Sequence, residues 1–112
     1  MEMKDYEEIA LQLIATSGTA KSMYVEAMNL ARKGKIEEAE KMVGEARKIF
    51  IDGHKSHQDL LVKEANGQTK NIPLLIIHAE DQMASVEILE IAVEQCIALY
   101  KILKANDIKL RR

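Results

Sequence analysis

Three polar residues in one short segment carry groups suited to phosphoryl chemistry. His78, Asp81 and Gln82 are spaced by three and four residues, so a helix would place them on one face. An imidazole at neutral pH offers an unprotonated ring nitrogen that can attack phosphorus while the other nitrogen keeps its proton. A lone histidine beside the apolar run 74–77 is more often a structural or surface residue than a nucleophile. The spacing alone therefore leaves both interpretations open.

Two other groups of reactive side chains are less suggestive. His54 and His57 lie one helical turn apart and could chelate a metal, but His57 falls on an apolar seam and no third ligand lies nearby in sequence. The one cysteine, Cys96, stands among apolar residues such as Val93 and Ile97, which favours an inert buried thiol. A single cysteine forms no internal disulfide, which fits a reducing cytoplasm.

Length and composition predict one globular domain, residues 1–112, because 47% of the 112 residues are hydrophobic and 30% are charged. A net charge of −2 gives no basic footprint for nucleic acid. We interpret residues 106–112, with their basic end, as a flexible tail. The polar start, 1–5, does not resemble a signal peptide, and no run approaches the roughly 18 apolar residues of a membrane span. We therefore expect a cytoplasmic protein without membrane insertion.

Helix-breaking residues divide the chain into three helices. Gly34 suits a left-handed helix stop, and the polar stretch 66–70 forms a second break. Asn71 is expected to cap the last helix, with Pro73 in its first turn. No segment alternates as a half-buried strand does. The sequence predicts an all-α, antiparallel, up-down three-helix bundle, with helices at about 5–33, 35–65 and 72–105.

The first two helices each carry a heptad seam, which is typical of coiled-coil-like packing. Glycines interrupt these patterns, and we expect a kink or close contact near Gly18. The seam of the first helix comprises Ile9, Leu13, Thr16, Ala20, Met23, Ala27 and Leu30. That of the second comprises Ile36, Ala39, Val43, Ala46, Phe50, Gly53, His57 and Leu60.

The third helix carries two apolar stripes. The first stripe comprises Leu75, Ala79, Gln82, Val86, Leu89, Val93, Cys96, Tyr100 and Leu103. The second stripe comprises Leu74, Ile77, Asp81, Ala84, Ile88, Ile91, Gln95, Ala98 and Ile102. A helix of an isolated three-helix bundle needs only one such stripe, so the second predicts coverage by another copy of the chain.

Two members of the second stripe, Asp81 and Gln95, are polar. Polar residues at such positions can fix helix register and oligomer number. If copies of the helix meet around an axis, the Asp81 carboxylates converge and must take up protons or bind a hard cation such as Mg²⁺. Alternatively, Asp81 lies at the edge of the stripe and faces water. Periodicity alone does not separate these possibilities.

The run Ile76-Ile77-His78-Ala79-Glu80-Asp81-Gln82-Met83 resembles the active-site segment of the lactose/cellobiose (diacetylchitobiose) enzyme IIA proteins of the bacterial phosphotransferase system. That segment typically reads Leu-Val-His-Ala-Gln-Asp-His-Leu-Met. The similarity extends over nearly the whole chain and includes Met23, Glu26-Ala27, Ala31-Arg32, Ala39-Glu40, His54 and the loop before Pro73.

The resemblance implies that His78 accepts a phosphoryl group from the carrier protein HPr and passes it to the IIB component during β-disaccharide uptake. It also implies a homotrimer whose third helices form a central coiled coil. Asp81 matches an axial aspartate that shares Mg²⁺ or another divalent cation among three subunits, which favours the metal interpretation of this residue.

Two positions beside His78 depart from the family pattern, and we expect both to neighbour the phosphoryl group. Glu80 replaces the usual glutamine, and its carboxylate would repel a phosphoryl oxygen where an amide would donate to it. Gln82 replaces the usual histidine and removes a possible second cation. Because His78, Ala79 and Asp81 are retained, we expect transfer to survive.

Two other functions remain as alternatives. One is a non-catalytic helical adaptor whose exposed stripe binds a partner helix, in which case His78 would be replaceable. The other is a metal-dependent hydrolase that uses His54, His57, His78 and Asp81.

Overall fold

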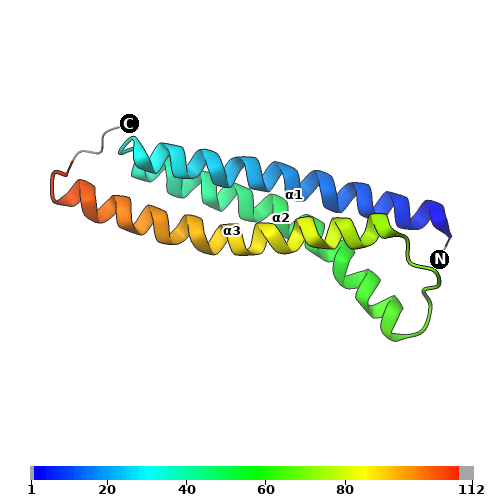
Figure 1. Cartoon of the computed structure of the whole chain (residues 1–112). Coiled ribbons are helices and arrows are strands. Elements are labelled where there is room, and N and C mark those ends of the chain that lie inside the picture. Colours follow the sequence, from blue (N-terminus) through cyan, green and yellow to red (C-terminus); the bar gives the residue numbers. More distant parts are fainter. Residues whose placement is uncertain (1, 109–112) are drawn as a thin grey trace.

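A computed structural model describes residues 2–108 and consists of three long helices (Figure 1). They are α1 (Met3–Arg32), α2 (Ile36–Ala65) and α3 (Leu74–Ala105). Successive helices run in opposite directions, and the bundle measures 57 × 22 × 16 Å. Residues 2–108 contain no strand. The predicted three-helix bundle is thus confirmed, with helix bounds within two residues of those expected.

Each helix ends in the same pair of backbone hydrogen bonds, which define a Schellman motif. After α1, the N–H groups of Gly34 and Lys35 donate to the carbonyl oxygens of Ala31 and Leu30. Gly34 has φ +83°, so the predicted left-handed stop is confirmed. Gly67 and Asp107 occupy the equivalent left-handed positions after α2 and α3. Residues 106–108 thus close α3, and the rest of the predicted tail lies outside the described residues.

The predicted start of α3 was wrong for both Asn71 and Pro73. Asn71 does not cap the helix, because Pro73 occupies the cap position and Leu74 is the first helical residue. Asn71 instead has φ +49°, a left-handed conformation that asparagine tolerates in turns. A capping residue needs extended backbone dihedrals, so the turn at Asn71 delays the helix.

Helix α1 is the centre of the bundle, because it packs along both α2 and α3, whereas the backbones of α2 and α3 come close at only a few positions. Only Leu13, Ala20 and Ala27 of its predicted seam are fully buried, and the other four positions are half-buried. The buried heptad series is shifted because α1 is covered on two sides and buries two tyrosines. Its members are Tyr6, Ala10, Leu13, Ser17, Ala20, Tyr24, Ala27 and Ala31.

The predicted seam of α2 is confirmed, since every member is buried except His57, which is partly buried. The close helix contact expected near Gly18 lies instead at Gly53. A methyl group added at Gly53 would collide with the Thr16 hydroxyl on α1, whereas one at Gly18 would meet nothing within 4 Å. Small residues on α2 therefore let α1 and α2 approach closely, opposite the middle of α1.

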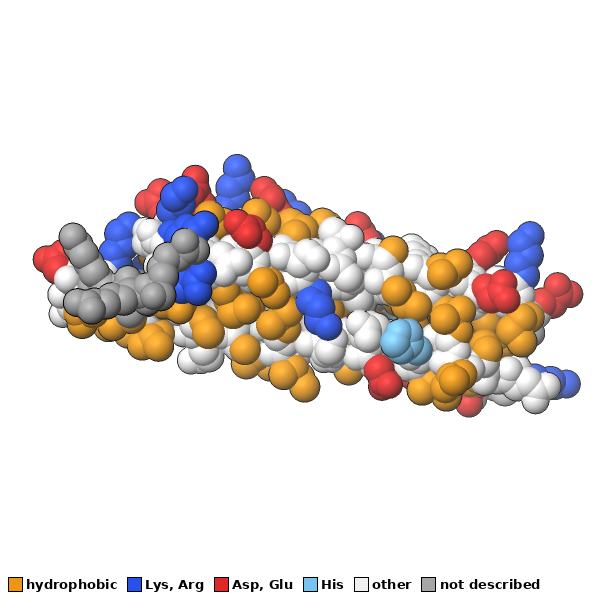
Figure 2. Space-filling view, turned by 45° about the horizontal axis from the view of Figure 1, so that its top comes forward, with side chains coloured by type: hydrophobic (Ala, Val, Ile, Leu, Met, Phe, Trp, Pro, Cys, Tyr) orange, Lys and Arg blue, Asp and Glu red, His pale blue; other side chains and the backbone are white. Residues whose placement is uncertain are grey.

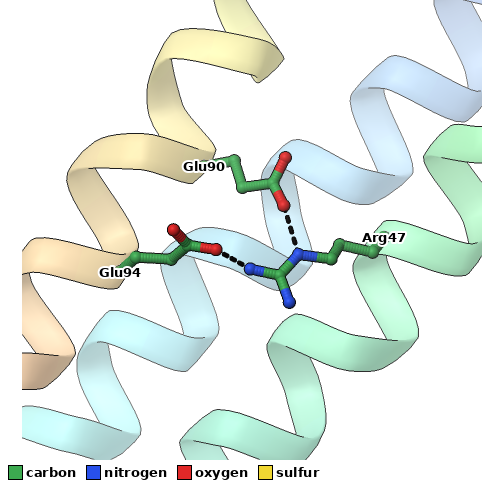
Figure 3. A network of polar contacts seen from close by, with 3 residues as sticks. All are labelled: Arg47, Glu90 and Glu94. Atoms are coloured by element: carbon green, nitrogen blue, oxygen red, sulfur yellow. Dashed lines mark hydrogen bonds and ion pairs between the residues drawn. The ribbon is translucent and has the colours of Figure 1, made fainter.

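Polar side chains bridge α2 and α3 where their backbones stay apart. Arg47 on α2 contacts both Glu90 and Glu94 on α3 (Figure 3). Further along, Lys101 pairs with Glu40 at 3.3 Å. Tyr24 of α1 is fully buried near this network, and burial, followed by the negative charge of Glu90, raises the pKa of Tyr24 to about 12. Charged side chains thus join α2 and α3 above the buried hydroxyl group of Tyr24.

The two apolar stripes of α3 have opposite environments. Every residue of the first stripe is buried or half-buried, whereas every residue of the second stripe is exposed. Ile88 and Ile91 expose 70% and 63% of their surface, and Val93 of the first stripe exposes none. Figure 2 shows hydrophobic side chains gathered along the lower edge of the molecule. No helix within residues 2–108 is long and apolar enough to cross a membrane.

Candidate functional site

The imidazole of His78 is exposed on the second turn of α3. The helix is anchored beneath it by Ile76, Ala79 and Met83, which are all buried in the core. Because these neighbours hold the backbone, the position of the His78 side chain is set by rigid helix rather than by a loop. A visiting protein can therefore reach the ring without opening the bundle.

The loop that precedes α3 is fastened to α1 through Tyr6. The buried Tyr6 hydroxyl donates a hydrogen bond to the Lys70 carbonyl oxygen and accepts one from the Lys70 N–H, both at 3.1 Å. This pair of bonds fixes the chain shortly before the left-handed turn at Asn71. The sequence interpretation missed the role of Tyr6, although a tyrosine before an apolar seam commonly finds a hydrogen-bond partner when buried.

The structure places Asp81 and Gln82 on either side of the direction in which His78 points, as their spacing predicts. Gln82 is half-buried in the first stripe, and its backbone carbonyl oxygen accepts a hydrogen bond from the Ser85 hydroxyl at 2.7 Å. Asp81 is exposed within the second stripe. Its carboxylate has no ion-pair partner among residues 2–108. It is thus a free hard ligand on an apolar face.

Glu80 lies apart from this group. Two residues along a helix turn the side-chain direction by about 200°, so Glu80 points away from His78 of the same chain. Its Oε1 lies 2.8 Å from Nε2 of His57 on α2, whose side chain is 18% exposed. Within one chain Glu80 therefore contacts α2 rather than the space beside His78. The sequence interpretation missed this partner, although a histidine on an apolar seam requires one.

The two histidines of α2 do not form a metal site with the residues around them. The rings of His54 and His57 have centroids 5.9 Å apart, and His54 also packs against Phe50. Within residues 2–108, no three His, Cys, Asp or Glu side chains gather closely enough to hold an ion. The hydrolase alternative, which requires His54, His57, His78 and Asp81 together, thus has no assembled centre in this chain.

Comparison with known proteins identifies the family. Residues 8–101 match the family of PTS system, lactose/cellobiose-specific IIA subunits. A lactose-specific EIIA component of Streptococcus mutans is 30% identical over 101 residues, which cover 90% of this chain and 97% of that protein. An oligo-beta-mannoside-specific EIIA component of Bacillus subtilis is 30% identical over 85% of this chain and 86% of its own length.

Solved structures of related proteins have the same fold as this chain. The cellobiose-specific enzyme IIA of Bacillus anthracis superposes with a TM-score of 0.86, at 33% identity and 94% coverage of both chains. The Escherichia coli IIA(Chitobiose), whose structure was solved in complex with HPr, shares the fold with a TM-score of 0.77 at 24% identity, covering 93% of this chain and 99% of that one. The predicted resemblance is therefore confirmed, and this chain belongs to the lactose/cellobiose-specific IIA subunits of the sugar phosphotransferase system.

Proposed function

We propose that His78 carries the phosphoryl group, which it receives from HPr and delivers to the IIB component of the same transport system. The observation that supports this most strongly is the exposed imidazole of His78 on a turn of α3 whose neighbouring residues are buried in the core. The described histidines other than His78, at positions 54 and 57, are partly buried among aromatic rings or paired with a carboxylate. The complex of the Escherichia coli relative with HPr is consistent with this donor.

In the proposed reaction, one ring nitrogen of His78, Nε2 in the form the family resemblance implies, attacks the phosphorus of phospho-HPr in line. The new N–P bond forms as the bond from phosphorus to the donor breaks, and no net oxidation occurs. A cysteine of IIB then attacks the same phosphorus and frees His78. Since the transition state is loose, the chain contributes mainly positioning and nearby dipoles. The sugar meets the membrane component of the transport system and need not contact this chain.

The second stripe supports a homotrimer. An exposed row of isoleucine, leucine and alanine side chains along α3 is unusual for an isolated domain and suits burial against identical rows around a threefold axis. A cyclic arrangement makes the three α3 helices parallel. The trimer would turn the second stripe into a coiled-coil core and leave the bundle of each chain intact.

The trimer would also bring three Asp81 carboxylates together. At the level of Asp81 along α3, each chain offers one unpaired carboxylate. An ion held there would therefore need ligands from several chains. Carboxylate oxygens are hard ligands that suit Mg²⁺ or a similar divalent cation, so the donor chemistry fits. When bound, the ion would offset the repulsion of the three charges and so support the assembly. We assign it no part in phosphoryl transfer.

The exposed second stripe also gives the adaptor alternative its one supporting observation, because a foreign helix could cover the same face. The two functions differ in what they require of His78. A carrier depends on the imidazole, whereas an adaptor tolerates its loss. A cytoplasmic location follows from the proposed partners of the carrier rather than from the fold.

The test is a reconstituted relay with labelled phosphoenolpyruvate, enzyme I and HPr. We expect HPr-dependent labelling of the wild-type chain and none of His78→Ala. His54→Ala serves as the matched control and should be labelled like the wild type. An unlabelled wild-type chain, or equal labelling of His78→Ala, would contradict the carrier function and favour the adaptor.

A further inference from the structure

The contact between His57 and Glu80 connects α2 to the turn of α3 that carries His78. The Nε2 of His57 lies 2.8 Å from Oε1 of Glu80, and a carboxylate only accepts hydrogen bonds, so Nε2 must be the donor. The other ring nitrogen of His57 is buried without a partner among the described residues. The bond to Glu80 is therefore the one polar contact that holds the orientation of this ring.

Within residues 2–108, this is the only polar contact that joins α2 and α3 at its end of the bundle. The other polar contacts between α2 and α3 involve Arg47 and Glu40 on α2, which lie far along the helix from His57. Among the residues that the structure describes, the contact with His57 is the only hydrogen bond or ion pair that the Glu80 carboxylate makes. Glu80 is 41% exposed, so without its partner the carboxylate would be free to rotate.

The direction of Glu80 matters because of the second stripe. At about 100° per residue, His78 and Glu80 fall on opposite flanks of that stripe. Around a threefold axis, one flank of each helix meets the other flank of the next. In the proposed trimer, the Glu80 side of one chain thus borders the His78 side of its neighbour. A released carboxylate there would repel an incoming phosphoryl group and would add charge next to Asp81.

We propose that His57 is a positioning residue for phosphoryl transfer, which holds the Glu80 carboxylate against α2 and away from the phosphoryl site. The inference rests on the proposed function and trimer. It explains how this chain carries a glutamate at a position where the family motif has an amide. His57 does not touch the phosphoryl group, and it acts only through Glu80.

The experiment measures the rate of HPr-dependent labelling in full-length variants. His57→Ala releases Glu80, and we expect labelling to slow by roughly tenfold, in line with the cost of misplacing charge near a transferring group. Adding Glu80→Gln to His57→Ala removes the freed charge and should restore the rate to within about threefold of wild type. A packing defect at position 57 would persist in the double variant, so rescue identifies the charge as the cause.

His54→Ala is the matched control, because it removes a neighbouring ring of the same size that has no bond to α3. Circular dichroism checks that each variant keeps its helices. If His57→Ala does not fold, His57→Phe replaces it, since phenylalanine fills the space but donates no hydrogen bond, and the same slowing and rescue are expected.

Three results would contradict the inference. They are an unchanged rate in the His57 variant, slowing that Glu80→Gln does not relieve, and equal slowing in His54→Ala. The proposed function fails in a different way, namely through a wild-type chain that takes up no label, and that result would remove the inference as well.

Discussion

The two faces of α3 are almost equally apolar, yet one is buried and the other is exposed. Val86 and Val93 of the first stripe are packed against the core, whereas Ile88 and Ile91, in the adjoining turns, are largely exposed. The same helix thus stabilises the fold through one face and presents the other to its surroundings. His78 lies at the border between them, where buried neighbours hold its backbone and its side chain is exposed.

This difference shows that the hydrophobicity of a helix face does not by itself reveal what covers it. The first face is covered within the chain mainly by α1, along which α3 packs over its length. The second face carries Asp81 and Gln95, which no core of a single chain would easily accept. This is why we propose that the second face is covered by identical faces around an axis rather than by a core within one chain.

The largest expected effect comes from placing a charge on the buried face. Val93→Asp would bury an unpaired carboxylate in the core and should destabilise the bundle by about 4 kcal/mol or more. We expect loss of most helical signal at room temperature, measured by circular dichroism. A folded Val93→Asp variant of normal stability would mean that the first stripe is not the core of the bundle.

The matching change on the exposed face should break assembly without breaking the fold. Ile91→Asp removes roughly 2 kcal/mol of apolar burial per chain in a trimer and sets three charges around one axis. We expect helical content to persist while light scattering reports monomers in place of trimers. If the unmodified protein is already monomeric at micromolar concentration, the prediction of a central coiled coil is wrong.

Replacing Asp81 should have a smaller effect and the opposite sign. Asp81→Leu puts an apolar layer where three carboxylates would meet, so we expect the trimer to persist and to gain about 1–4 kcal/mol. Sedimentation at several concentrations, with and without a divalent chelator, measures this change. Chelation should weaken the wild-type trimer and leave the variant unaffected. Equal sensitivity of both proteins to the chelator would argue against a metal at Asp81.

The smallest effect concerns Tyr24, which is buried near the ion pairs of Arg47 with Glu90 and Glu94. Burial, then Glu90, raises the pKa of Tyr24 from 10.0 to about 12, so the folded chain keeps this proton where the unfolded chain loses it. This contribution to stability, up to about 3 kcal/mol, is complete below pH 10 and is lost as pH rises towards 12. Denaturant unfolding between pH 9 and 12 should show a steeper loss for wild type than for Tyr24→Phe. Parallel curves would contradict this.

Most of the fold follows from the sequence because heptad spacing determines which side of a helix is buried. The seam of α2, except for His57, and the first stripe of α3 were predicted residue by residue, and Gly34 was placed at its turn. The seam of α1 was less well predicted, because a helix covered on two sides has a wide buried face and periodicity fixes only its average direction. Asn71 was misassigned, because a left-handed residue and a helix cap favour the same residue type.

The candidate site was predictable only in part. The shared direction of His78, Asp81 and Gln82 depends on local spacing, which the sequence contains. Glu80 and His57 lie 23 positions apart in the sequence. Their contact depends on how α2 and α3 are rotated relative to each other, which local spacing does not specify. The anchoring of the preceding loop by Tyr6 across 64 positions is of the same kind.

The most direct test of the central claim is to map the phosphoryl group after incubation with enzyme I, HPr and phosphoenolpyruvate. Peptide mass spectrometry under mildly alkaline conditions, which preserve phosphohistidine, locates the modified residue. We expect one phosphoryl group per chain, on residue 78, which passes on when IIB is added. A phosphoryl group on His54 or His57, or none on any residue, would contradict the assignment of His78.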